Sequence, residues 1–142
     1  MDFSSLTPGR VIETPSYSVT EEEIREFALR YDPQWFHTDS GRAQASRWGG
    51  LIASGWHTCA IAMRLVVEAV LATSNSIGSP GVEQVRWLSP LRPGMHVTVH
   101  IEVLECRRSK SGRSGIVRWR WRMVSNTGVQ VLELIATSLF EL

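Results

Sequence analysis

Tyr31 to Leu71 reads YDPQWFHTDSGRAQASRWGGLIASGWHTCAIAMRLVVEAVL, and the second half of this stretch decides the fold. We expect a long helix from Ser54 or Gly55 to about Thr73, because the segment is apolar and free of internal breakers. Most faces of this helix are apolar, and a helix of that kind is surrounded by other structure. The sequence therefore predicts a long central helix.

The rest of the chain predicts a helical lead-in and a sheet. Thr20-Glu-Glu-Glu23 is a capping box that begins a helix, and Pro33 ends it because proline disfavours helical geometry at the residue before it. Asp39 can cap a further short helix. A loop is expected over residues 74–80, and at most an edge strand over residues 11–19, which contain a proline. Segments rich in Val, Ile and Trp predict strands over 82–88, 97–105, 115–125 and 129–140.

One long buried helix followed by consecutive antiparallel strands indicates an α+β fold, with a curled sheet wrapped around the helix. We expect residues 1–142 to form a single domain, since the length suits one domain and no boundary interrupts the pattern. The helix carries one polar stripe, His57, Arg64 and Glu68. We interpret His57 as a residue of that face and not as a second base.

Composition excludes several classes of protein. The chain is 43% hydrophobic with a net charge of +1, which argues against disorder and provides no overall attraction for nucleic acid or an anionic membrane. The N-terminus lacks the apolar run of a signal peptide, and two cysteines are too few for a disulfide framework, so we expect a cytoplasmic protein with reduced thiols. The four histidines lack metal-ligand spacing, so neither a metal nor another cofactor is expected.

The first half of the opening stretch carries candidate chemistry. Asp32 and His37 lie in a short loop just before the start of the long helix, whose free N–H groups can stabilise a developing negative charge. Either residue alone is best interpreted as an ordinary turn or loop residue. Together, and next to a helix N-terminus, they favour proton transfer beside a carbonyl group, since an imidazole ordinarily titrates near pH 6.5.

These features resemble the MaoC-like (R)-specific enoyl-thioester hydratases and dehydratases, which have the hotdog fold. The family's loop has Asp, any residue, Asn-Pro, an aliphatic residue and His; Asp32-Pro-Gln-Trp-Phe-His37 keeps the spacing, with Gln34 and Trp35 in place of Asn and Pro. The family's Ala-Ser, Gly-rich and Ser-Gly elements are similar to Ala45-Ser46, Gly49-Gly50 and Ser54-Gly55 here. Val85 to Gly94 resembles its later strand and Arg-Pro-Gly turn. The order of these short motifs, over nearly the whole chain, is the specific part.

The resemblance implies reversible hydration of a 2-enoyl thioester of CoA or an acyl carrier to an (R)-3-hydroxyacyl thioester. Asp32 and His37 would act on one water, and the N–H of Gly55 would bind the thioester oxygen. We expected glycine there because a side chain would block the ligand. A homodimer is also implied. The expected substrate-binding residues are Gln34, Trp35, Trp48, Gly50, Ser54 and Trp56.

Several interpretations stay open at this stage. Gln34 is interpreted as an amide that braces the loop, and Ser54 as a helix cap or a substrate contact. Trp119 and Trp121 alternate with Arg118 and Arg120, which favours core tryptophans and a solvated basic face. The alternative is a site for the phosphates of the substrate. Basic residues that could contribute to it also include Arg107, Arg108, Lys110, Arg113 and Arg122. Two other functions compete: a hotdog thioesterase, and a non-catalytic acyl-thioester-binding subunit.

Overall fold

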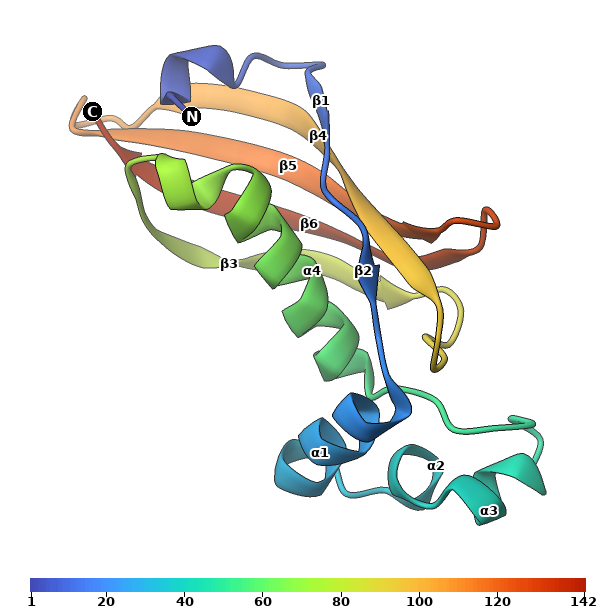
Figure 1. Ribbon diagram of the computed structural model, residues 1–142. Helices are drawn as coiled ribbons and strands as arrows, with labels where there is room; N and C mark the ends of the chain where they lie inside the picture. The colour runs from blue at the N-terminus through green and yellow to red at the C-terminus, as the bar shows by residue number, and fades with distance from the viewer.

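A computed structural model describes residues 1–142. Its centre is the 15-residue helix α4, Gly55–Ala69, which crosses one face of a curved antiparallel sheet (Figure 1). The sheet runs in the order β1-β4-β5-β6-β3, and β2 also pairs with β4. Strands β1, Val11–Glu13, and β2, Tyr17–Ser18, are short. The main strands are β3 Ser76–Trp87, β4 His96–Arg108, β5 Ser114–Ser125 and β6 Gln130–Glu141. The predicted sheet curled around a central helix is confirmed.

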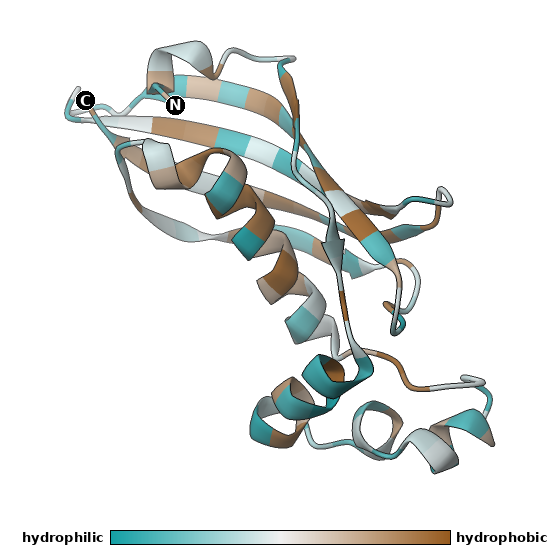
Figure 2. Cartoon of the chain, in the orientation of Figure 1, coloured by the Kyte–Doolittle hydropathy of each residue, from teal (hydrophilic) through white to brown (hydrophobic).

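The core lies between α4 and the facing side of the sheet. Every second residue is buried there from Val97 to Val103 of β4 and along β5, and hydrophobic and hydrophilic residues alternate along these strands in Figure 2. Helix α4 contributes Ile61, Ala62, Leu65 and Val66. The sheet contributes Val97, Val99, Ile101, Val103, Val117, Trp119, Trp121 and Met123, among others. The predicted burial of both strand tryptophans is confirmed.

Helix α4 is less completely enclosed than its composition suggested. Trp56 is 62% exposed and Met63 is 40% exposed, so one side of the helix remains uncovered in the isolated chain. Conversely, the interpretation of His57 as part of a polar stripe is wrong, because His57 is buried while Arg64 and Glu68 form an exposed ion pair. The side of α4 that faces helix α1, Glu21–Tyr31, is therefore the buried polar side.

The end of the long helix also differs from the expectation. Helix α4 ends at Ala69 because Val70 leaves helical geometry, and a short 3-10 helix, η2, follows at Leu71–Thr73. Part of the expected loop at 74–80 belongs to β3, which starts at Ser76. Pairing with β6 supplies hydrogen bonds that the local Ser/Gly/Pro composition does not reveal, and register shifts accommodate Gly78 and Gly81.

The N-terminal segment first passes through a 3-10 helix, η1 Phe3–Ser5, and two short edge strands, β1 Val11–Glu13 and β2 Tyr17–Ser18. Helix α1, Glu21–Tyr31, starts at the predicted cap, with the Glu23 N–H donating to Thr20 Oγ1 at 3.1 Å. The predicted short helix is α3, Ser40–Gln44, capped by Asp39. The single-turn helix α2, Trp35–Thr38, was expected to be a loop. Together, α1, α2 and α3 lie beyond the N-terminal end of α4 (Figure 1).

The outer face of the sheet carries ion pairs. Arg118 pairs with Glu83 at 3.0 Å, and Arg120 pairs with Glu102 at 2.8 Å and Glu133 at 3.1 Å. These guanidinium groups are therefore already engaged by carboxylates, which counts against the alternative in which they bind phosphates. None of the helices combines the length and apolarity needed to cross a membrane.

Candidate active site

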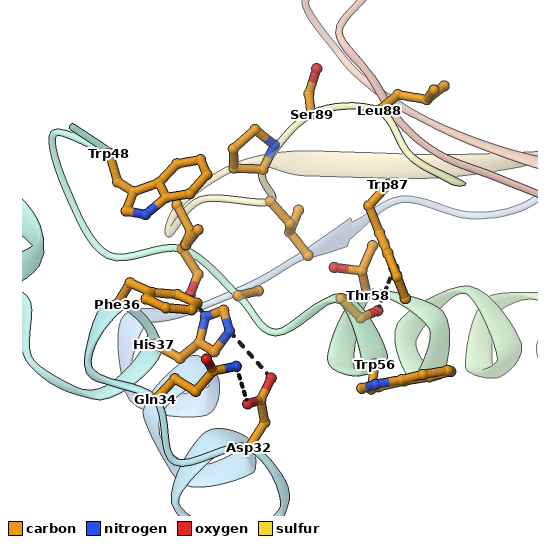
Figure 3. A pocket seen from close by; sticks show the side chains of 15 residues that line it. Asp32, Gln34, Phe36, His37, Trp48, Trp56, Thr58, Trp87, Leu88 and Ser89 are labelled. Atoms are coloured by element: carbon orange, nitrogen blue, oxygen red, sulfur yellow. Dashed lines mark hydrogen bonds and ion pairs between the residues drawn. The ribbon is translucent and has the colours of Figure 1, made fainter. Parts of the chain in front are cut away.

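A pocket of about 470 Å³ lies beside the N-terminus of α4. One wall comes from the segment that joins α1 to α2, and the opposite wall from the end of β3 and the loop that follows it (Figure 3). Asp32, Gln34 and His37 line one side, whereas Trp56 and Trp87 stand across from them. Three segments that are distant in the sequence thus meet at one cavity.

Asp32 is held by hydrogen bonds to both of its carboxylate oxygens. It follows α1 as the C-terminal cap, where Pro33 prevents the helix from continuing. Ser54 Oγ donates to Oδ2 at 2.7 Å, and Gln34 Nε2 donates to Oδ1 at 2.8 Å. Burial raises the pKa of Asp32, but the Ser54 and Gln34 hydrogen bonds and the nearby His37 ring outweigh it, so the pKa lies below its ordinary value. The group is a carboxylate at neutral pH.

His37 lies on α2 and is 4% exposed. Its Nδ1 is 2.7 Å from the carbonyl oxygen of Ile52, and its Nε2 is 3.3 Å from Asp32 Oδ2. A carbonyl oxygen only accepts hydrogen bonds, so Ile52 assigns the ring proton of neutral His37 to Nδ1. The neutral ring then presents a bare Nε2 beside the Asp32 carboxylate. Because both are acceptors, a donor such as a water molecule can hydrogen-bond to both at once.

The start of α4 completes this side of the pocket. As the first residue of the helix, Gly55 has a backbone N–H without an acceptor inside the helix. Ser54 occupies the capping position, but its hydroxyl makes no capping bond and donates to Asp32 instead. The interpretation of the Ser54 hydroxyl as a helix cap is therefore wrong, whereas its role as a substrate contact stays a prediction.

The reason for glycine at position 55 also differs from the expectation. A Cβ atom there would lie 2.5 Å from Cε2 of Trp87, and the indole Nε1 of Trp87 donates to the Gly55 carbonyl at 2.8 Å. The indole, and not an approaching ligand, already occupies the space beside Gly55. Trp87 was missed as a site residue, although it belongs to the Val85–Gly94 segment that carries part of the resemblance.

The structure brings only some of the expected binding residues to the pocket. Gln34, Trp48 and Trp56 line it, whereas Trp35, Gly50 and Ser54 do not. Trp35 lies under the guanidinium of Arg42 instead, with Cζ 4.4 Å from its ring centroid. Phe36, which clusters with Trp35, Trp48 and Trp56 around the site and was considered as a pocket wall or as a packing residue, also lines the cavity. Sequence reasoning did not identify the remaining lining residues, which are Ile52, Ala53, Thr58 and the residues from Trp87 to Leu91.

Comparison with known proteins agrees with this architecture. The family model described as "MaoC like domain" matches residues 3–121. The crystal structure of a MaoC-like dehydratase from Rhodospirillum rubrum is 35% identical, has a TM-score of 0.89, and covers 97% of this chain and 94% of its own. A conserved hypothetical protein from Mycobacterium tuberculosis with a double hotdog fold is 20% identical, has a TM-score of 0.77, and covers 98% of this chain and 43% of its own, which supports the expected hotdog fold.

A curated relative adds a named activity. The 3-hydroxyacyl-thioester dehydratase Z of Mycobacterium tuberculosis is 30% identical over 98 residues. The match covers 68% of this chain and 65% of that protein, so about a third of the relative has no counterpart in the alignment. The family-model match over residues 3–121 includes Asp32, His37 and the start of α4.

Proposed function

Because the chain belongs to the MaoC-like domain family, we propose that it is a hydro-lyase that reversibly hydrates a trans-2-enoyl thioester to an (R)-3-hydroxyacyl thioester. The acyl group would be carried by CoA or by an acyl carrier, as expected in fatty acid metabolism. The observation that carries the proposal is the pair of Asp32 and His37, 3.3 Å apart in a pocket that also receives the N-terminus of α4. No metal or other cofactor takes part.

In the proposed reaction, one water binds between the Asp32 carboxylate and His37 Nε2. Nε2 removes a proton as the water oxygen bonds to C3 of the enoyl group, and that proton is delivered to C2, so the product gains one water in total. The hydrogen bond that His37 Nδ1–H donates to the Ile52 carbonyl leaves Nε2 free to accept the proton. The N–H of Gly55 stabilises the enolate-like thioester oxygen, and losing such a donor typically costs ~2.7–4 kcal/mol of barrier.

The pocket walls provide the remaining substrate contacts in this proposal. Trp48 and Trp56 would contact the acyl thioester, while Gln34 and Ser54 act by holding Asp32. Trp35 and Gly50 would support the loop from outside the pocket.

We further propose that the chain is one domain that assembles as a homodimer through the open edge of β3. This strand pairs only with β6, and it exposes Ile77, Val82 and Trp87. Light scattering at micromolar concentration is expected to give a dimer, and Val82→Arg is expected to shift it toward a monomer. A monomeric wild type would refute this assembly.

The free thiols of Cys59 and Cys106 agree with a cytoplasmic location.

A thioesterase is the second candidate among enzymes. It would need a carboxylate elsewhere, often on the central helix, and Glu68 is the only acidic residue of α4. Glu68 is engaged by Arg64 at 2.8 Å and does not line the pocket. The geometry therefore favours hydration.

The test is the loss of enoyl-thioester absorbance with crotonyl-CoA and longer 2-enoyl-CoAs. Asp32→Asn and His37→Ala are each expected to reduce kcat by about 10²–10⁴-fold, the usual contribution of a general acid–base group. His100→Ala is the matched control, since His100 is a partly exposed residue outside the pocket. Release of free CoA would indicate a thioesterase, and binding without turnover would indicate a non-catalytic subunit.

A further inference from the structure

A second imidazole–carboxylate pair joins the two helices that deliver the candidate active site. His57, the third residue of α4, is 4% exposed, and its Nε2 is 2.8 Å from Oε2 of Glu23 in the first turn of α1. The other oxygen of Glu23 accepts a hydrogen bond from the Tyr17 hydroxyl at 2.6 Å. The proposed hydration uses none of these three side chains.

The His57 ring is also stacked on α1. Its plane lies 8° from that of Phe27, with ring centroids 4.6 Å apart. The hydrogen bond and the stack together define both the position and the tilt of the ring against α1. This contact is therefore specific in direction, unlike ordinary apolar packing.

The protonation of His57 follows from its surroundings. Burial lowers the pKa of His57 below its ordinary value and outweighs the Glu23 carboxylate, which raises it. In the neutral ring, Nε2 carries the proton and donates to Glu23, because a carboxylate only accepts. Nδ1 is then a buried acceptor, and it has no hydrogen-bond partner. Such an atom destabilises a fold, so a phenylalanine would serve better if this position only had to stack on Phe27.

Helix α1 is attached to the start of α4 at both of its ends. At one end Glu23 bonds His57, and at the other Asp32 bonds Ser54 at 2.7 Å. Along a helix these two points are about 14 Å apart. The fully buried Ile24 and Ala28 pack α1 against the rest of the protein. The two hydrogen bonds add a directional contact at each end of the helix, and the one at Glu23 limits small rotations that would turn the Asp32 carboxylate relative to His37 and Gly55.

We propose that His57 is a positioning residue: its hydrogen bond to Glu23 holds α1 so that the Asp32 carboxylate faces His37 and the N-terminus of α4. This inference rests on the proposed hydratase function and assigns a role to a pair outside the reacting groups. It predicts that the pair affects the catalytic step far more than substrate binding or stability.

The experiment compares His57→Phe and Glu23→Leu, which remove the hydrogen bond, with Glu23→Gln, which retains an oxygen acceptor for His57. We expect the first two variants to lower kcat by about 10–100-fold at nearly unchanged KM, because a misplacement of about 1 Å has effects of that order. Glu23→Gln is expected to stay close to wild type. Arg64→Leu is the matched control, because it breaks only the exposed pair with Glu68 on the same helix.

Two further measurements separate positioning from a general structural role. His57→Phe is expected to keep the melting temperature of wild type, while amide hydrogen exchange over residues 24–34 becomes faster. A kcat close to wild type in both His57→Phe and Glu23→Leu would overturn the inference. The inference would also be overturned if His57→Phe and Glu23→Leu lowered kcat only in proportion to a lower melting temperature, and Glu23→Gln lowered kcat to the same extent.

Failure of the proposed function gives a different result. If wild type turns over no enoyl thioester, the hydratase proposal fails. The role of the His57–Glu23 hydrogen bond in holding α1 is then judged by amide hydrogen exchange alone. In that case unchanged protection of residues 24–34 in both His57→Phe and Glu23→Leu would overturn the inference.

Discussion

Gly55→Ala tests why glycine occupies the first position of the central helix. The added Cβ would lie 2.5 Å from Cε2, 2.7 Å from Nε1 and 2.8 Å from Cδ2 of the Trp87 indole. Nonbonded carbon and nitrogen atoms do not approach each other this closely, so the Trp87 indole must move. Movement is possible because Trp87 is 46% exposed, but it breaks the hydrogen bond from Nε1 to the Gly55 carbonyl.

The expected loss of stability combines three contributions. Overpacking costs about 1–3 kcal/mol, and loss of the indole hydrogen bond about 0.5–1.5 kcal/mol. Replacing glycine in a helix restores about 0.5–1 kcal/mol. The net destabilisation is therefore about 2 kcal/mol, which lowers the melting temperature of a domain of this size by about 4–8 °C.

The assay is urea unfolding of wild type, Gly55→Ala, Trp87→Leu and the double variant. With the indole removed, the alanine has room, so Gly55→Ala should cause little or no further destabilisation in the Trp87→Leu background. The coupling free energy between the two positions is then about 2 kcal/mol. If Gly55→Ala is as stable as wild type, or equally destabilising in both backgrounds, the indole is not the reason for glycine. A further loss of kcat/KM in the double variant relative to Trp87→Leu would instead support close approach of the substrate.

Other predictions concern ionisation and the core. Ser54→Ala removes a hydrogen bond that lowers the pKa of Asp32, so the acidic limb of the pH profile of kcat/KM should move to higher pH; an unmoved limb would contradict this role. Because the folded-state pKa of Asp32 is depressed, its stabilising contribution is present above about pH 4 and is lost as the pH falls through the folded-state pKa. The difference in unfolding free energy between wild type and Asp32→Asn should therefore shrink as the pH falls below about 4. The folded-state pKa of His57 is also depressed, so below about pH 6.5 the unfolded chain binds more protons than the folded chain. Wild type should therefore lose stability as the pH falls below about 6.5. Denaturant titrations at several pH values should show a smaller loss for His57→Phe. Trp119→Phe removes a buried bond to Ser138 at 3.1 Å and leaves a small cavity, so calorimetry should show a destabilisation of about 1–3 kcal/mol, and an unchanged melting temperature would argue against tight packing at this position.

Local patterns made most of the fold predictable. The cap at Thr20, the break at Pro33 and the alternation around Trp119 each act within a few residues, and the corresponding elements are present. The reciprocal half of the predicted capping box does not form, because the Glu23 carboxylate accepts from side chains outside α1 instead. The strand over Ser76–Pro80 was missed because its partner is β6, some 60 residues later in the chain. A Ser/Gly/Pro-rich segment resembles a loop until a distant strand supplies its hydrogen bonds.

The candidate site, like the fold, was only partly predictable from the sequence. Asp32, His37 and the helix start at Gly55 were recognisable as chemical groups because their order and spacing lie within one short stretch. Their partners were not recognisable, since Ser54 bonds Asp32 across 22 residues and the Ile52 carbonyl bonds His37 across 15. The role of Trp87 beside Gly55 joins positions 32 residues apart.

The sequence by itself determined the central helix, most of the strands, the positions of the candidate catalytic groups in the chain and the family architecture, because periodicity, caps and breakers act locally. Only the tertiary structure decided the tautomer of His37, the hydrogen bonds that keep Asp32 ionised, the burial of His57 against Glu23, and the indole that requires glycine at position 55. Each of these depends on the direction of a side chain toward a distant segment, and that direction is set by how α1, α4 and β3 pack together.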